Sequence, residues 1–171
     1  MKRIFSFTTT AAVLGVASAT VFGLSSALMA DPVAEAKELV TAYYEASQTE
    51  NWNAIYLQFD ETAEISVTTD YGYGGPATTM EFLASEWDSL PEPTYSEADA
   101  ALLADYSELS RSMEIVEATE VEGGVMVRAV QTVNFKTSTY EGTVAETDAF
   151  LVKRSFGQPL IQDLTSTHVY Q

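Results

Sequence analysis

Apolar side chains recur every three to four residues in the part of the chain that begins at Asp31. Asp31 is a residue type that caps helix N-termini, and Pro32 suits a first helical turn. The apolar positions that follow share one helical face, and they are Val33, Ala36, Leu39, Val40, Tyr43 and Tyr44. This pattern predicts an amphipathic helix that starts at Asp31.

The helical spacing returns over a shorter span after a polar break, at Trp52, Ile55, Tyr56 and Phe59. This second pattern predicts a short helix. Residues 63–69 then alternate in the manner of a strand, with Ile65 and Val67 on one side. The glycines and proline of residues 71–76 favour turn geometry and predict a loop.

Two more helices are predicted before residue 110. Thr78 and Glu81 have the spacing of a capping box, and Phe82, Leu83, Trp87 and Leu90 continue a helical pattern over residues 78–90 until the prolines at 91 and 93. Residues 96–109 predict a fourth helix, short and acidic.

From Met113 onward the apolar period changes to two, which is typical of strands. Four β-rich runs are separated by turns and cover residues 113–121, 125–135, 143–154 and 160–170. Because helices come first and strands follow, the elements are expected to form segregated layers. The predicted fold class is α+β, with N-terminal helices packed on a curved antiparallel sheet.

The first thirty residues have the layout of a secretory leader. Lys2 and Arg3 precede an apolar stretch without Asp, Glu, Lys or Arg, and small residues stand near its end. A signal peptide over residues 1–30 is therefore predicted, with cleavage near 27/28 or 30/31, and residues 31–171 would form a single domain. The predicted location is periplasmic or secreted. The alternative is that the stretch is retained as a membrane anchor.

Composition narrows the partners and the chemistry. The chain has 25 acidic and 8 basic residues and a net charge of −17, so nucleic acid and, once the leader is removed, membranes are not expected partners. It has no cysteine and one histidine, His168, so no metal site is predicted. The glycines at 72, 74 and 75 lack the following Lys-Ser/Thr of a phosphate-binding loop, and no cofactor is predicted.

The order of predicted elements, together with the stretch at residues 50–60 (ENWNAIYLQFD), resembles the nuclear transport factor 2-like superfamily, which includes ketosteroid isomerases and polyketide cyclases. The resemblance covers nearly all of residues 31–171. It implies a cone-shaped fold whose mouth opens between helices and sheet, and a possible homodimer through the outer surface of the sheet. The fold alone does not assign a reaction.

The isomerases of this superfamily use a tyrosine and a protonated aspartate as an oxyanion hole, and a second aspartate as the base. By resemblance, the tyrosine falls on Tyr43 and the hydrogen-bonding aspartate on Asp148, while the base position falls on or next to Val67. Valine cannot accept a carbon-bound proton, and the nearest carboxylate is Asp70. Isomerase chemistry of that type is therefore not expected.

Asp148 and His168 are the candidate catalytic residues, because an imidazole near a carboxylate can act as an acid or base. The alternative for His168 is a half-exposed residue of the last strand. Arg128 is a charge inside a strand pattern, on the face of Met126 and Val130. It would either reach into the cone to hold a ligand carboxylate or pair with a neighbouring acid.

Aromatic residues at helical spacing are usually core, but some are expected to line a hollow under the helices. The candidate ligand-binding residues are Tyr43, Trp52, Tyr56, Phe59, Phe82, Trp87 and Arg128. The predicted function is binding of a small, mostly apolar or aromatic molecule. The alternatives are a cofactor-independent lyase, dehydratase or isomerase, and a dimeric interaction module that uses the outer sheet face.

Overall fold

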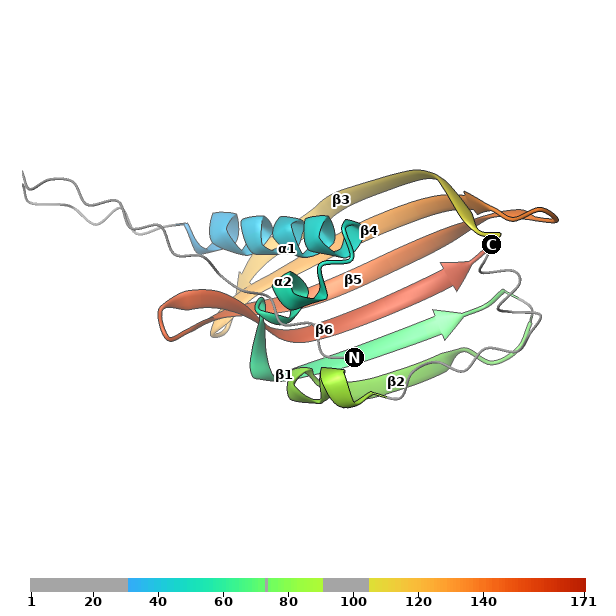
Figure 1. Ribbon diagram of the computed structural model, residues 1–171. Helices are drawn as coiled ribbons and strands as arrows, with labels where there is room; N and C mark the ends of the chain where they lie inside the picture. The colour runs from blue at the N-terminus through green and yellow to red at the C-terminus, as the bar shows by residue number, and fades with distance from the viewer. Residues whose placement is uncertain (1–30, 73, 91–104) are drawn as a thin grey trace, which may run out of the picture.

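The computed structural model describes residues 31–72, 74–90 and 105–171 (Figure 1). The predicted signal peptide and residues 96–104 of the predicted fourth helix lie outside the described residues. The elements are α1 (Pro32–Gln48), α2 (Trp52–Tyr56), β1 (Phe59–Asp70), β2 (Thr78–Leu83), the 3-10 helix η1 (Ala84–Ser89), β3 (Ser107–Val121), β4 (Gly124–Lys136), β5 (Glu141–Ser155) and β6 (Gln158–Tyr170). None of the described helices is long and apolar enough to cross a membrane.

The first helix is confirmed, together with its cap. Asp31 Oδ1 accepts a hydrogen bond from the backbone N–H of Val33 at 3.0 Å, and Pro32 occupies the first turn. Ala36, Val40 and Tyr44 are buried on one face of α1. This face lies against β3, β4 and β6, so α1 covers one side of the sheet (Figure 1).

The sheet is six-stranded and mixed, in the order β2-β1-β6-β5-β4-β3. The last four strands form the predicted antiparallel meander, but β1 pairs with β6 in parallel. The prediction of a purely antiparallel sheet was therefore wrong at this one pairing. A run of strands in sequence order reveals its hairpins, whereas the partner of an isolated strand 100 residues away leaves no local signal.

Strand β4 shows how the core forms. Its residues alternate between buried and less buried positions, and Val125, Val127 and Ala129 are among the buried ones. Successive side chains of a strand point to opposite faces, so these residues lie under α1 together with Phe150 of β5. The buried face of the sheet and the apolar face of α1 form one core.

The predicted helix over residues 78–90 is wrong in its first half. Residues 78–83 form β2, which pairs antiparallel with β1, and only Ala84–Ser89 form a helical turn of 3-10 type. The capping glutamate was expected at Glu81 but is Glu86, whose Oε2 accepts a hydrogen bond from Leu83 N at 2.9 Å. Pairing with β1 outweighs the weak helical pattern of this short segment.

Two other boundaries differ from the prediction. The second helix ends at Tyr56, and Phe59 begins β1 instead of ending the helix. Residues 107–109, predicted as the end of a fourth helix, begin β3. The predicted loop is confirmed for residues 71–72 and 74–76, which lie between β1 and β2 in the chain; residue 73 lies outside the described residues. Gly72 is required there, because its φ is +72° and a Cβ would lie 2.3 Å from the carbonyl oxygen of Tyr170.

Candidate functional site

The concave face of the sheet, which α1 partly covers, changes from apolar to polar along the strands. Near the start of β4, Val127 is opposite Phe150 of β5, which is opposite Leu164 of β6. Two residues further along each strand, the same face carries Ala129, Asp148 and Ser166, and the next row carries Gln131, Glu146 and His168. We call the polar side chains gathered here the polar network, and its members are Tyr44, Arg111, Gln131, Glu146, Asp148, Ser166 and His168.

Asp148 is the most buried carboxyl group of the network, with 1% of its surface exposed. The hydroxyl of Tyr44 donates a hydrogen bond to Asp148 Oδ2, so helix α1 provides a direct partner for this strand residue. The other oxygen, Oδ1, has no hydrogen-bond partner among the described residues. A buried acceptor without a partner is costly, so this atom marks a place where the fold leaves a polar group unsatisfied.

Burial raises the pKa of Asp148 to about 7, and the negative charge of nearby Glu146 contributes to the same shift. A direct interaction with the Glu146 side chain adds to the rise, whereas the neighbouring hydroxyls of Ser166 and Tyr44 act in the opposite direction and favour the carboxylate. Asp148 can therefore change its protonation state close to neutral pH. Burial, with the charges of Asp148 and Glu146, also raises the pKa of Tyr43 and Tyr44, which keeps both hydroxyls protonated.

Glu146 is held in place by an amide on the neighbouring strand. Gln131 Nε2 donates to Glu146 Oε2 at 2.8 Å, and Gln131 Oε1 accepts from Arg111 at 3.2 Å. Arg111 also forms an ion pair with Glu108 at 2.5 Å. The network thus runs from β5 across β4 to β3. Because Gln131 is only 3% exposed, its two hydrogen bonds fix the orientation of its amide and the position of the Glu146 carboxylate.

His168 completes the network on β6. Its Nε2 lies 2.9 Å from Ser166 Oγ and 3.8 Å from Glu146 Oε1. Burial lowers the pKa of His168, and the charge of Asp148 only partly offsets this effect. The imidazole is therefore neutral at pH 7 and carries one nitrogen that accepts hydrogen bonds or protons. The predicted pair of Asp148 and His168 does lie together, with Ser166 between them in β6.

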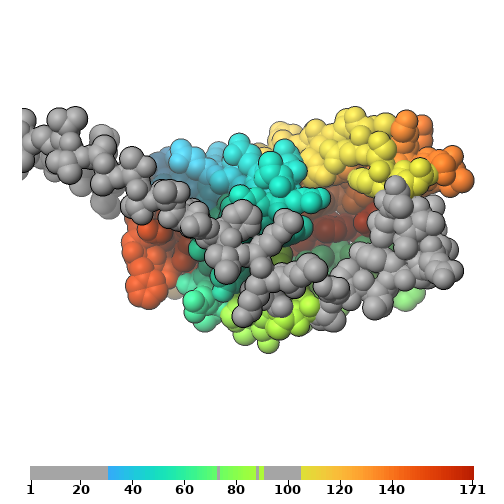
Figure 2. Space-filling model, viewed as in Figure 1, coloured from blue at the N-terminus to red at the C-terminus, as the bar shows by residue number. Residues whose placement is uncertain are grey.

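The side chains of Glu146 and His168 remain partly accessible, at 18% and 29% exposure. In Figure 2, a hollow opens between the helices (cyan) and β3 (yellow), and atoms of β6 (dark red) form its floor. Strand β6, which carries Ser166 and His168, therefore lies at the floor of a recess on this side of the molecule.

Tyr43 and Tyr44 exchange the roles that the sequence suggested. Tyr44 makes the hydrogen bond to Asp148, whereas the ring of Tyr43 packs edge-on against Phe59 and Phe150, with centroid distances of 6.0 and 5.2 Å. Adjacent residues on a helix are about 100° apart. An alignment that is wrong by one position therefore moves the tyrosine from the carboxyl group to its apolar surroundings.

The other predicted aromatic residues lie away from the polar network. Trp52 and Tyr56 are 58% and 37% exposed on α2. Phe59, Phe82 and Trp87 form a cluster of their own, in which Trp87 lies 5.9 Å from Phe59 and 5.6 Å from Phe82 between ring centroids. Phe82 also lines a separate depression of about 580 Å³ along β1, β2 and β6.

Arg128 lies on the outer face of the sheet. Its side chain is 61% exposed and stands 3.9 Å from Glu117 of β3. Of the two interpretations of this residue, the structure therefore matches pairing with a neighbouring acid. An exposed pair of this kind contributes little to stability, at about 0–1 kcal/mol.

Sequence reasoning missed Tyr44, Glu146, Gln131, Ser166 and Arg111 as members of the site. A signal was available for two of them, because Glu146 and Ser166 stand two positions before Asp148 and His168, and the period of a strand puts such residues on one face. Gln131 and Arg111 carried no such signal. Their places depend on the register of β3 and β4, including two irregularities in the pairing of these strands.

A further set of aromatic residues, also missed, stands at the end of the sheet beyond the polar network. We call it the aromatic rim, and it consists of Tyr71, Tyr106, Phe135, Tyr140 and Tyr170. Tyr106 stacks on Phe135 at 5.3 Å, and Tyr71 stacks on Tyr170 at 5.6 Å, with interplanar angles of 24° in both pairs. Phe135 contacts both Tyr140 and Tyr170. Five separate segments of the chain contribute these rings, so no local sequence pattern predicts that they cluster.

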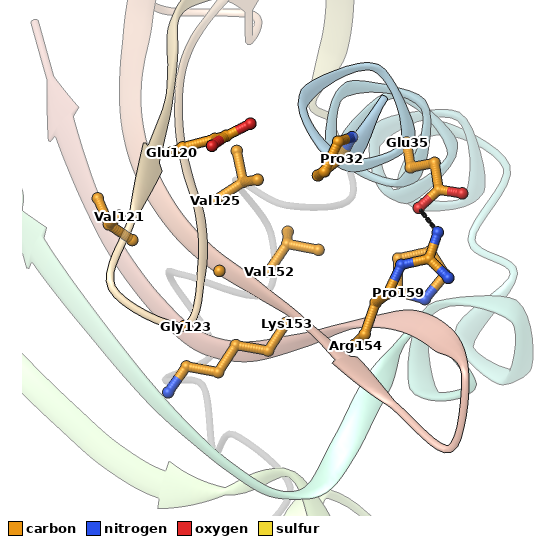
Figure 3. Close-up of a pocket in the computed structure, with 11 residues that line it drawn as sticks. Pro32, Glu35, Glu120, Val121, Gly123, Val125, Val152, Lys153, Arg154 and Pro159 are labelled. Carbon is orange, nitrogen blue, oxygen red and sulfur yellow. Dashed lines mark hydrogen bonds and ion pairs between the residues drawn. The ribbon is translucent and has the colours of Figure 1, made fainter. Parts of the chain in front are cut away.

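A cavity of about 300 Å³ lies at the opposite end of the sheet, under the first turn of α1 (Figure 3). Val125 and Val152 line it together with Pro32, and an ion pair between Glu35 and Arg154 stands at its edge. None of the polar network residues lines this cavity. Among the described residues, no group of three or more His, Asp or Glu side chains is arranged to hold a metal ion.

Solved structures share this architecture. A ketosteroid isomerase-like protein from Erwinia carotovora atroseptica superposes with a TM-score of 0.53 at 14% identity, covering 82% of this chain and 98% of that protein. A conserved protein from Planctomyces limnophilus has a TM-score of 0.51 at 11% identity, with 81% and 94% covered. No protein-family model and no curated protein matches the sequence. The resemblance predicted from the order of elements is confirmed for the architecture: this chain has the nuclear transport factor 2-like fold.

Proposed function

We propose that the protein binds a small molecule in the hollow over the polar network, with an apolar or aromatic body and at least one hydrogen-bonding group. The observation that carries this proposal is the position of Glu146 and His168, which stay partly accessible although each forms a hydrogen bond with a neighbouring side chain. Small-molecule sites typically combine an apolar surface with a few fixed polar groups. Here the polar groups stand between the apolar core and the aromatic rim.

His168 is the only histidine, so its ring signals in an NMR spectrum report on this site alone. Titration with 2-phenylethanol is expected to shift these signals in a saturable way, with a dissociation constant on the order of millimolar for so small a ligand. Val144→Phe, which enlarges a residue on the concave face opposite Tyr170, is expected to abolish the shift. Ala145→Phe places the same ring on the other face of β5 and should leave the shift intact.

The proposal fails if the His168 signals do not respond to 2-phenylethanol, to its amine or to its carboxylate analogue. It also fails if Val144→Phe folds normally and binds as the unmodified protein does. Thermal unfolding of both variants shows whether the fold is retained.

A lyase, dehydratase or isomerase is the second candidate, favoured by a neutral imidazole next to two carboxyl groups. The carboxylate base of the isomerases is absent from its expected place, because that position holds Val67. The residues opposite Val67 in the flanking strands, Ser166 and Met80, are not carboxylates either. Asp70 Oδ1 accepts a hydrogen bond from Gly72 N at 2.9 Å and serves the turn. In an enzyme of this class, His168 would be the acid or base.

If the protein is such an enzyme, His168→Gln is expected to lower kcat by about 10²-fold or more while changing ligand affinity little. Steady-state kinetics and direct binding of the same compound would test this. Equal losses in turnover and in affinity would contradict a catalytic role for His168 and support a binding role. Export from the cell and a homodimer through the outer sheet face remain predictions from the sequence.

A further inference from the structure

The polar network contains acidic groups without a matching cation. Glu146 receives one hydrogen bond from a neutral amide and stands beside a histidine whose pKa is lowered by burial. Arg111 is linked to Glu146 through Gln131, but its guanidinium forms an ion pair with Glu108 at 2.5 Å. Among the described residues, Glu146 therefore forms no ion pair with a lysine or arginine, and Arg111 acts on it only from a distance, across Gln131.

The other lysines and arginines that the structure describes lie outside the polar network. After the leader, the basic residues besides Arg111 and His168 are Lys37, Arg128, Lys136, Lys153 and Arg154. Arg128 and Arg154 pair with Glu117 and Glu35, away from the network. Of the three lysines, Lys37 is exposed on α1, Lys136 is exposed at the end of β4 next to Phe135, and Lys153 lines the cavity under α1. Residues 91–104 contain no lysine, arginine or histidine.

Asp148, which interacts directly with Glu146, is a second sign of a missing partner. It is 99% buried next to Glu146 on the concave face, and its Oδ1 lacks a hydrogen-bond donor among the described residues. A carboxylate that meets a donor or a positive charge gains stability, whereas one that is left alone in the interior is disfavoured. The donor that Asp148 lacks and the charge that Glu146 lacks are both properties of an ammonium group.

The aromatic rim offers a surface for the remainder of such a ligand. Tyr170 stands two residues beyond His168 on the same face of β6, so the rim begins within about 7 Å of the network. Tyr71, Tyr106 and Tyr140 are about half exposed, and their rings are available for stacking. Aromatic faces attract cations and pack against flat apolar groups.

We propose that the hollow binds a small organic amine, whose protonated nitrogen lies against Glu146 and Asp148 and whose apolar or aromatic body lies against the aromatic rim. This proposal rests on the proposed function and names the chemical class of its ligand. The strongly negative net charge of the chain also attracts cations, which is a further reason to expect a cationic ligand.

Three compounds with one ring and one short chain test the proposal: 2-phenylethylamine, 2-phenylethanol and phenylacetate. Binding is measured from the His168 ring signals and by calorimetry at pH 8. The amine is expected to bind at least about tenfold more tightly than the alcohol, and the carboxylate most weakly of all. Glu146→Gln is expected to remove this preference, because it should lower the affinity for the amine at least about tenfold more than the affinity for the alcohol.

Glu117→Gln is the matched control, because it removes the same charge from the outer face of the sheet and should change none of the three affinities. The dependence on pH adds an independent signature. The titratable groups around Asp148 are Tyr43 and Tyr44 on α1, Glu146 on β5 and His168 on β6, with the Arg111–Glu108 pair beyond them. As pH rises from 5 to 8, Asp148 loses its proton and His168 loses any positive charge, so the affinity for the amine should rise.

If the alcohol or the carboxylate binds as tightly as the amine, or if Glu146→Gln binds the amine unchanged, the assignment of an amine is wrong while small-molecule binding stands. If none of the three compounds binds, the proposed function itself fails. These two failures are therefore distinguishable in one set of titrations.

Discussion

Asp148→Asn is expected to remove a large part of the dependence of stability on pH. The pKa of Asp148 is about 7 in the folded protein, against an ordinary value of 3.8. Because the folded state holds this proton more tightly than the unfolded chain, the stabilisation is complete below pH 4 and is lost as pH rises through 7. A shift of this size corresponds to a loss on the order of 4 kcal/mol in the free energy of unfolding.

Asparagine keeps the shape of the side chain and can still accept the hydrogen bond from Tyr44, but it does not ionise. Urea unfolding at a series of pH values between 4 and 8.5 should therefore show a steep decline for the unmodified protein and a much flatter curve for Asp148→Asn. His168, whose pKa is lowered, acts in the opposite direction in both proteins, and more strongly in Asp148→Asn, because the Asp148 charge that partly offsets the lowering is removed.

Tyr44→Phe provides the matched comparison for this experiment. The variant loses the hydrogen bond that favours the carboxylate, so the pKa of Asp148 should rise further and the decline in stability should move to higher pH. Parallel curves for Asp148→Asn and the unmodified protein would contradict the assignment of this titration to Asp148.

Phe150→Ala is expected to cause the second large effect, a loss of about 3–5 kcal/mol in the free energy of unfolding. Phe150 has no exposed surface, and its ring packs against Tyr43 and Tyr44 at centroid distances of 5.2 and 6.1 Å. Truncation leaves a cavity between β5 and α1 that these rings cannot fill without leaving their own contacts.

The control for this variant is Phe156→Ala, because Phe156 is fully exposed in the turn between β5 and β6. It should change stability by less than about 0.5 kcal/mol. Denaturant unfolding of the two variants measures both values under the same conditions. A loss below 1 kcal/mol for Phe150→Ala would show that α1 does not press on the sheet at this point.

The sequence predicted those parts of the fold whose signal is local. The caps and spacing of α1 and the alternation of β4 to β6 depend only on neighbouring residues, and each was placed within a few positions of its bounds. Residues 78–83 were misassigned because six residues fit a helical and a strand pattern equally well, and their pairing with β1 decides between them.

The sequence predicted two residues of the site but not the side chains that contact them. Asp148 was identified through the resemblance to the isomerases, and His168 because it is the one histidine of the sequence. Their partners were not identified, because Tyr44 differs from Tyr43 only by its direction from the helix, and Gln131 matters only through its register with Glu146. The aromatic rim required the ends of several strands to be placed together in space.

The position of β6 in the middle of the sheet has a consequence for biosynthesis. The hairpin of β1 and β2 joins the other strands only through β6, which follows β3, β4 and β5 in the chain. The edge of β1 that pairs with β6 therefore stays exposed until all of these strands have been synthesised. A protein with such a late pairing keeps an open strand edge for longer than one whose strands pair only with their neighbours in sequence.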